Sequence, residues 1–142
     1  MAIQKQEFYE GAALHQLARR GKIASLKYEA PFFIINREVF VCLKYSTRNR
    51  TPWGFTFTPD EQVLLRNRAK HSPLIIGLIC GTDGIAAIGY ESFREIAPPK
   101  KIAIHVSCYR RHGQHYGVFG PKGEHSRKIA PSSWQRILDE NE

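Results

Sequence analysis

The sequence contains few cysteines and no long hydrophobic run. It has three cysteines, an odd number without close spacing, which excludes the disulfide framework of a small secreted domain. The longest uninterrupted apolar stretch, residues 73–80, is far too short to cross a bilayer. The N-terminus, MAIQKQEFYEG, has no apolar run behind its charges and does not fit a standard export signal. These absences predict a soluble, reduced, cytoplasmic protein without a membrane partner.

Acidic residues are also scarce. Thirteen Asp and Glu residues stand against 21 Lys and Arg residues, which gives a net charge of +8. The basic residues are spread over several loops and helix ends rather than gathered in a tail. Such a distribution is typical of a folded surface that binds a polyanion, most often nucleic acid. The alternative is an incidental basic charge on a protein that binds nothing acidic.

The length and the hydrophobic content predict one domain. A chain of 142 residues with 42% hydrophobic residues can bury a real core. We expect a single domain over residues 1–142, with a core over residues 1–96. After a proline-rich break at residues 97–99, residues 97–142 are expected to add a β-hairpin and a short helix. The acidic end, residues 139–142, is expected to fray.

Local patterns predict the order of helices and strands. The expected elements are a helix at 5–20, extended segments at 25–30 and 32–36, a strand at 39–46, a loop at 47–57 whose last residues alternate as a strand would, a helix at 59–70, strands at 74–80 and 85–90, a short strand or turn at 91–96, strands at 101–109 and 116–119, and a helix at 132–138. Because a helix lies between them, the strands at 39–46 and 74–80 are expected to be parallel. The predicted fold class is α/β, with a mixed sheet of four or five core strands flanked by two helices.

The strand at residues 39–46 carries a lysine near its end. Its odd positions are apolar throughout, whereas its even positions end in Lys44 and Ser46. A two-residue turn after the preceding strand makes the paired residue numbers sum to an odd number, which places Glu29 beside Cys42 and Lys44. A three-residue turn would reverse this parity and put Asn36 there instead. We therefore expect a carboxylate beside an amine at one end of a hairpin.

A second carboxylate lies on the apolar side of the first helix. At 100° per residue, Glu10 shares a side with Ala13, Leu14 and Leu17. Burying a carboxylate alone is costly, so Glu10 is expected to be paired or to coordinate a ligand. The alternative is a position at the edge of this side, where Glu10 reaches water.

Together these segments resemble the PD-(D/E)xK nuclease superfamily, which includes restriction endonucleases and Holliday-junction resolvases. The shared features are a helix with a glutamate, a hairpin with an acid and a lysine, a Ser/Thr-aromatic loop and a helix with a glutamine. They run from about Glu7 to Cys80. The resemblance implies a restriction-endonuclease-like αβββαβ core with a mixed sheet.

The resemblance also implies an active site. Lys44, Glu29 and Glu10 would be catalytic, and Glu29, Glu10 and the Leu43 carbonyl would hold Mg²⁺. Lys44 would orient or deprotonate the water that attacks a phosphodiester. The family's second acid falls on Cys42, and this is a departure because a thiolate is a poor partner for Mg²⁺.

The loop at residues 47–57 combines aromatic and cationic residues. Stacking surfaces beside cations suit single-stranded or distorted nucleic acid. Phe55 and Phe57 are expected in the core and Trp53 on the surface. The predicted nucleic-acid contacts, with DNA favoured over RNA, are Arg48, Arg50, Trp53, Gln62, Arg110 and Arg111.

Two other motifs suggest different chemistry. His105, Cys108, His112 and His115 are zinc-ligand types at short spacing, but strand parity puts His105 and Cys108 on opposite faces, and Cys108 is expected in the core. A cysteine nucleophile would need a histidine beside Cys42 or Cys108, and none lies near Cys42 in the sequence.

The sequence thus predicts a nucleic-acid-acting protein, namely a magnesium-dependent endonuclease-like hydrolase with a degenerate active site. One alternative is a catalytically inactive nucleic-acid-binding module on the same fold. Another is a protein-interaction domain whose charge is incidental. Because resolvase-like folds commonly dimerise, the resemblance also implies a homodimer.

Overall fold

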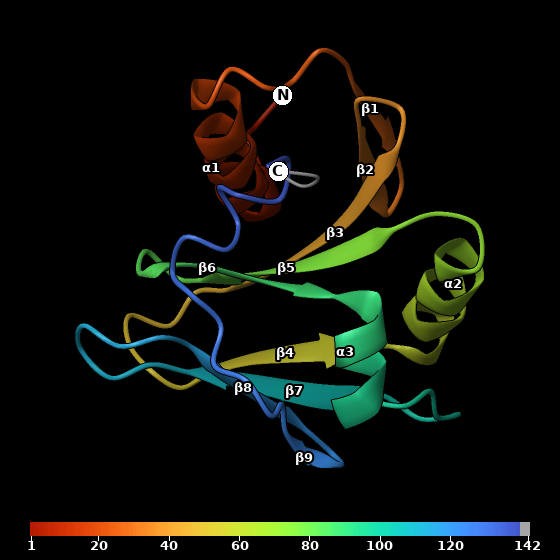
Figure 1. Ribbon diagram of the computed structural model, residues 1–142, viewed down its shortest axis with the longest axis vertical. Helices are drawn as coiled ribbons and strands as arrows, with labels where there is room; N and C mark the ends of the chain where they lie inside the picture. Colours follow the sequence, from red (N-terminus) through yellow and green to blue (C-terminus); the bar gives the residue numbers. More distant parts are fainter. Residues whose placement is uncertain (140–142) are drawn as a thin grey trace.

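The computed structural model describes residues 1–139 and contains two sheets (Figure 1). The first sheet has five strands in the order β1-β2-β3-β5-β6. Its strands are β1 (Leu26–Glu29), β2 (Phe32–Ile35), β3 (Val39–Ser46), β5 (Leu74–Cys80) and β6 (Gly84–Gly89). β3 and β5 are parallel and the other pairs are antiparallel, so the sheet is mixed, as predicted.

The second sheet is antiparallel and has the order β4-β7-β8-β9. Its strands are β4 (Trp53–Phe57), β7 (Ile104–Tyr109), β8 (Gly117–Gly120) and β9 (Gly123–Glu124). The predicted hairpin of residues 101–119 is present as β7 and β8. It joins β4, a strand from the middle of the chain, and so belongs to a larger sheet.

Three helices complete the fold, which confirms the α/β class. They are α1 (Lys5–Arg19), α2 (Pro59–Ala69) and α3 (Tyr90–Ile96). The side chain of Thr58 accepts a hydrogen bond from the Glu61 amide at 3.2 Å, and the Glu61 carboxylate accepts one from the Thr58 amide at 2.9 Å. This capping box confirms the predicted start of α2.

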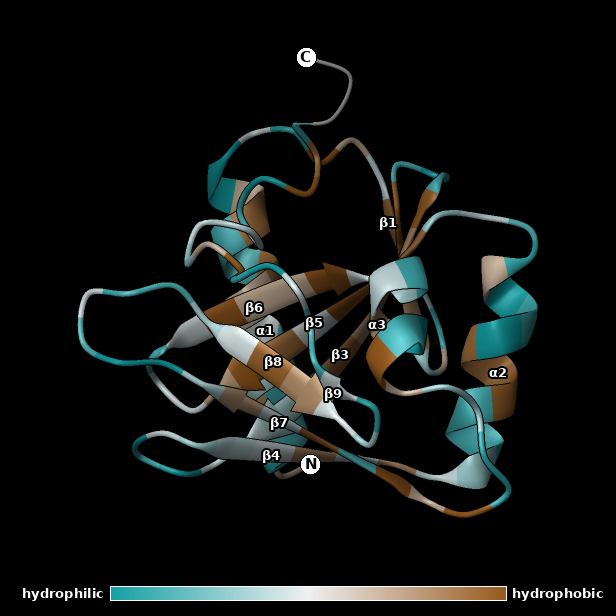
Figure 2. Ribbon diagram, turned by 60° about the horizontal axis from the view of Figure 1, so that its bottom comes forward, coloured by the Kyte–Doolittle hydropathy of each residue, from teal (hydrophilic) through white to brown (hydrophobic). Residues whose placement is uncertain are grey.

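The buried side chains form two clusters, one on each face of the first sheet. On one face, Val41 and Leu43 of β3 lie in a cluster with Leu17 of α1 and with Trp134 of the C-terminal segment. The other cluster lies between the two sheets and includes Cys42. Figure 2 shows hydrophobic residues concentrated along the strands that enclose this cluster, whereas the first and last turns of α2 are hydrophilic.

The turn between β2 and β3 has three residues, so the predicted two-residue turn is wrong. Ile35 pairs with Val39, and the paired residue numbers sum to an even number. Asn36 and Arg37 both have positive φ values, of 55° and 63°, which Asn tolerates better than most residues. The Asn36 side chain also accepts hydrogen bonds from the Ala24 and Ser25 amides, and these bonds favour the longer turn.

Two other predictions of secondary structure are wrong. Residues 91–96 belong to helix α3 instead of a strand or turn, and they bury Phe93 and Ile96. Residues 132–138 form turns rather than a helix, because this segment is held by tertiary contacts of Trp134. The predicted frayed end lies outside the described residues except for Asp139, whose carboxylate pairs with Arg20 at 2.7 Å and with Lys22 at 2.8 Å.

Among the residues that the structure describes, no helix combines the length and the apolar character that a bilayer crossing requires.

Candidate functional site

A small polar cavity lies at the end of β3, where Lys44 was predicted to act. Its volume is about 300 Å³, and its walls come from α1, β1 with the turn that follows it, β3, β4 and the first turn of α2. Glu10, Cys42, Lys44 and Glu61 all line it. Each of the four segments that carry the resemblance therefore contributes residues to this cavity.

Lys44 forms an ion pair with Glu61. The ammonium nitrogen lies 2.9 Å and 3.1 Å from the two carboxylate oxygens, and 5.0 Å above the centre of the Phe57 ring. The side chains are only 20% and 29% exposed. Burial by itself would raise the pKa of Glu61, but the hydrogen bond from the Thr58 amide and the Lys44 ammonium hold this pKa below its ordinary value.

Glu10 approaches the same cavity from α1. Gln6, one turn earlier, donates a hydrogen bond to its carboxylate at 2.8 Å. Burial raises the pKa of Glu10, and the bond from Gln6 opposes this effect. Glu10 was expected to be paired or to coordinate a ligand, with the edge of the apolar side as the alternative. In the structure it is half-buried, and its partner is the side-chain amide of Gln6.

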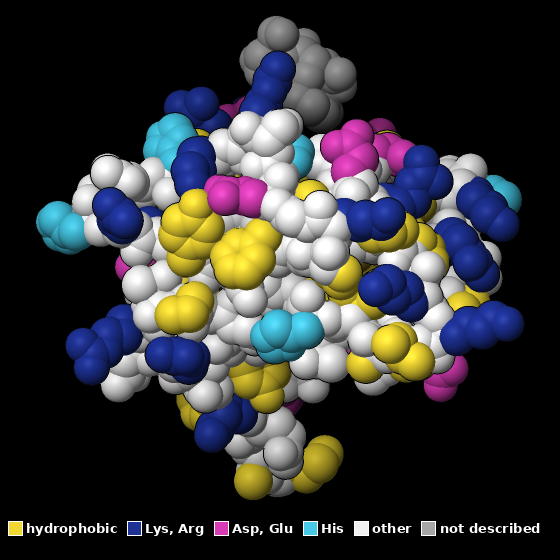
Figure 3. All heavy atoms as spheres, turned by 90° about the horizontal axis from the view of Figure 1, so that it is seen from below, with side chains coloured by type: hydrophobic (Ala, Val, Ile, Leu, Met, Phe, Trp, Pro, Cys, Tyr) yellow, Lys and Arg dark blue, Asp and Glu magenta, His cyan; other side chains and the backbone are white. Residues whose placement is uncertain are grey.

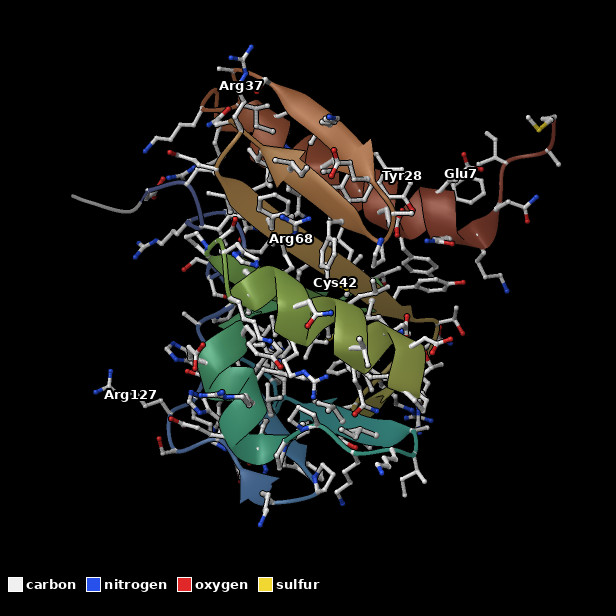
Figure 4. The ribbon with its side chains drawn as sticks, turned by 90° about the vertical axis from the view of Figure 1, so that its right-hand side faces the viewer. Glu7, Tyr28, Arg37, Cys42, Arg68 and Arg127 are labelled. Atoms are coloured by element: carbon white, nitrogen blue, oxygen red, sulfur yellow. The ribbon has the colours of Figure 1, made fainter. Side chains whose placement is uncertain are left out.

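Cys42 faces the interior between the first sheet and α2 (Figure 4). The thiol is buried, and burial raises its pKa to about 12, while the nearby Lys44 opposes the rise. The thiol is therefore protonated near neutral pH, and it serves neither as a hard metal ligand nor as an activated nucleophile.

Glu29 is not brought to Lys44. It lies on the edge strand β1 in register with Phe32, which in turn is in register with Cys42. Directly paired residues point to the same side of a sheet, so Glu29 faces the same side as Lys44. However, β2 lies between them, Glu29 is not among the residues that line the cavity, and its carboxylate pairs with Lys27 at 2.9 Å. The Lys27 ammonium lowers the pKa of Glu29, an exposed group.

The donor groups at this site do not fit Mg²⁺. Glu10 is bonded to Gln6, Glu61 is neutralised by Lys44, and the position of a second family acid holds the protonated thiol of Cys42. Leu43, whose carbonyl was assigned to the metal, lies in β3 opposite Gly77 of β5. Within residues 1–139, no three His, Cys, Asp or Glu side chains lie close enough to hold a metal ion.

The four arginines among the predicted nucleic-acid contacts fall into two groups. Arg48, Arg50 and Arg111 are exposed in loops, where a phosphate can reach them. Arg110 is engaged, since its guanidinium donates to Asp83 at 3.0 Å and lies 5.1 Å above the Tyr116 ring. It holds the loop before Tyr116 against the turn between β5 and β6.

Two of these predictions are wrong, because the side chains are buried. Trp53 is 2% exposed and donates its indole N–H to the Arg48 carbonyl at 3.1 Å. Gln62 is 5% exposed, and its amide bonds to the Phe57 and Ile102 carbonyls and to the Lys100 amide. Gln62 therefore joins α2 to the segment before β7.

The structure also adds a residue that the sequence analysis treated only as a helix cap. Glu61 was recognised by its spacing from Thr58, yet the same carboxylate neutralises Lys44. The signal for this second role was weak, because the two residues are 17 positions apart and belong to different elements. Cys108 is buried and His105 is exposed on the opposite face of β7, as strand parity predicted.

No protein-family model, no curated protein and no solved structure matches the chain. The functional assignment therefore depends on the geometry of the site.

Proposed function

We propose that this protein binds nucleic acid on a scaffold similar to that of the PD-(D/E)xK nucleases and does not cleave it. The observation that carries the proposal is the ion pair between Lys44 and Glu61 in the cavity at the end of β3. A lysine that must orient an attacking water beside a metal is held instead by a carboxylate from α2.

The order of elements supports the scaffold. Helix α1 is followed by β1, β2 and β3, then by α2 and β5, which is the αβββαβ order expected from the resemblance. β4 is inserted between β3 and α2 and pairs in the other sheet. The insertion brings Gly54, Phe55 and Thr56 to the wall of the cavity.

The chemistry of the cavity argues against hydrolysis. Phosphodiester cleavage by this mechanism needs a divalent ion between oxygen ligands and a base near the water. Here a neutral thiol occupies one ligand position, and the lysine amine is already paired. The affinity for the polyanion would instead come from the excess of cations, among them the exposed Arg48, Arg50 and Arg111.

A magnesium-dependent endonuclease is the second candidate, because Glu10 and Lys44 do share one cavity. Incubation of plasmid, branched DNA and RNA with Mg²⁺ or Mn²⁺ separates the two functions. We expect intact substrates. Cleavage that is lost in Lys44→Ala and in Glu10→Gln, but kept in the exposed control Lys27→Ala, would overturn the proposal and establish the enzyme.

Binding itself is tested by titrating labelled single-stranded and duplex DNA at several salt concentrations. We expect the affinity to fall steadily between about 50 and 200 mM salt, since bound phosphates release counterions. The double variant Arg48→Ala and Arg50→Ala should bind more weakly and show a shallower salt dependence. Its matched control is Arg19→Ala, which removes an exposed charge from the last turn of α1. No binding at low salt would favour the protein-interaction alternative.

A further inference from the structure

The outer face of the second sheet carries exposed and half-buried side chains. In β7, Ile104, Val106 and Cys108 point into the core, whereas His105, Ser107 and Tyr109 point outward. The strand register aligns Thr56 with His105, and it aligns both Gly54 and Phe119 with Ser107. The outer face therefore consists of rings, small side chains and glycines, with Phe119 37% exposed.

Two of the rings lie against glycines. A Cβ added to Gly117 would lie 2.5 Å from the Tyr109 ring, and one added to Gly54 would lie 2.8 Å from the His105 ring. Both distances are shorter than any normal contact between a Cβ atom and a ring. The glycines thus allow the rings of Tyr109 and His105 to lie down on the sheet, with one face of each ring directed outward.

Phe119 extends this surface beside Tyr109. The centres of the two rings are 5.9 Å apart, with an angle of 55° between the ring planes. The Lys128 ammonium lies 4.4 Å above the Tyr109 ring and 2.8 Å from the Glu124 carboxylate. Lys128 also donates a hydrogen bond to the Tyr109 hydroxyl, but it is 49% exposed. Because exposed ion pairs contribute little, a phosphate can compete with Glu124 for the lysine.

The surrounding charge is strongly positive. Residues 97–130 contain seven Lys and Arg residues and a single acidic residue, Glu124. All of these cations except Arg110 are exposed. Figure 3 views the molecule from the side of the second sheet and shows Lys and Arg side chains on both sides of a central area of hydrophobic side chains and a histidine.

The three rings are placed so that a nucleic-acid strand lying along β7 would contact them one after another. Successive outward positions of β7 are separated by about 6.7 Å, and neighbouring strands by about 4.8 Å. His105, Phe119 and Tyr109 thus occupy three consecutive rows of the outer face. At the β4 edge, Gly54 and Thr56 also line the cavity that holds Lys44, so the outer face and the cavity are continuous.

We propose that this outer face binds single-stranded nucleic acid, with bases stacked on Phe119, Tyr109 and His105 and phosphates held by the surrounding lysines and arginines. The inference rests on the proposed nucleic-acid binding and adds strand number and binding mode to it. A duplex keeps its bases paired and offers this face only phosphates, whereas an unpaired base offers a flat ring of its own.

The test compares four fluorescent ligands of equal length by anisotropy: dT12, rU12, a 12-base-pair duplex and an abasic oligonucleotide with the same number of phosphates. We expect dT12 or rU12 to bind at least about 10-fold more tightly than the abasic strand, since stacking contributes strongly per base. We also expect either strand to bind more tightly than the duplex. The DNA and RNA strands show which sugar is preferred.

The variants address the rings directly. Phe119→Ala should weaken binding of the preferred strand by about 5- to 150-fold, whereas Phe119→Trp should keep it. The matched control is Phe8→Ala, which removes a phenyl ring that is 63% exposed on α1, far from this sheet in sequence. Because Phe119 is at the surface, its variants should fold, and the thermal midpoint of each is compared with that of the unmodified protein.

The outcomes separate the two proposals. If the abasic strand or the duplex binds as tightly as dT12 and rU12, or if Phe119→Ala binds as the unmodified protein does, the stacking inference is wrong and nucleic-acid binding stands. If none of the four ligands binds at low salt, the proposed function fails as well.

Discussion

Lys44 and Glu61 form a partly buried ion pair in the cavity at the end of β3. A lysine at the end of a strand between apolar residues needs a partner, because a buried ammonium without one is costly. A carboxylate was predicted for this role, and the structure supplies one from α2 instead of from β1. The Lys44 amine is thereby paired with Glu61 at 2.9 Å.

The first prediction concerns the pH dependence of this pair. Because the pKa of Glu61 is lower in the folded protein than its ordinary value of 4.5, its charge stabilises the fold above that value. This stabilisation is lost as the pH falls through the folded pKa. We expect Glu61→Gln to lower the free energy of unfolding by about 1.5 kcal/mol at pH 7 and to have no effect once Glu61 is protonated.

Urea unfolding at several pH values between about 3 and 7 measures this difference. Gln keeps an acceptor for the Thr58 amide, so the capping box is retained. The control is Glu91→Gln, which removes an exposed carboxylate paired with Arg94 at 2.9 Å and should cost below about 0.5 kcal/mol at any pH. A constant difference between Glu61→Gln and the unmodified protein across this range would contradict the assignment.

At the scale of elements, local signals predicted what depends on local contacts. The Thr58 and Glu61 spacing located the start of α2, and the apolar run at residues 74–80 located β5. The turn length between β2 and β3 was not predictable from the strands themselves, because it depends on bonds from Asn36 to residues 24 and 25. Helix α3 has only seven residues, too few for a helical period to stand out.

The second prediction tests the contact between the turn that joins β5 to β6 and the loop that carries Arg48. Gly81 has a φ of +56°, and a Cβ added there would lie 2.2 Å from the Arg48 carbonyl oxygen. Backbone cannot move aside as a flexible side chain can. Gly81→Ala should therefore lower the free energy of unfolding by at least about 3 kcal/mol, from backbone strain and overpacking together.

Gly113→Ala is the matched control, because Gly113 has a φ of +74° and open space around its Cβ position. Gly113→Ala should lower the free energy of unfolding by about 1 to 2 kcal/mol, because it introduces the backbone strain alone. Equal losses in the two variants, measured by urea unfolding, would mean that the loop of Arg48 does not lie against this turn.

At the scale of the whole molecule, the C-terminal segment closes one face of the first sheet. Trp134 is fully buried, and its indole N–H donates to the Ala13 carbonyl of α1 at 2.9 Å. Its ring lies so close to Gly77 of β5 that an added Cβ there would be 3.2 Å away. One side chain thus links α1, the first sheet and a segment more than 120 residues away from the start of α1.

The third prediction follows from this link. Trp134→Ala should lower the free energy of unfolding by about 3 to 5 kcal/mol, because it leaves a large cavity between α1 and the sheet. Trp134→Phe keeps most of the ring and loses the hydrogen bond, so it should cost clearly less. Thermal and urea unfolding measure both variants. A loss below about 1 kcal/mol in Trp134→Ala would show that the segment is not part of the cooperative core.

The sequence alone determined the α/β class, the ends of α1 and α2, and the excess of cations, because each depends on composition or on contacts within a few residues. It also predicted that β3 and β5 are parallel, because a helix connects the two strands. Only the tertiary structure decided the partner of Lys44, the burial of Trp53 and Gln62, and the pairing of β4 with β7. These features depend on which distant segments meet, and a one-residue change in a turn reverses the face on which a side chain lies.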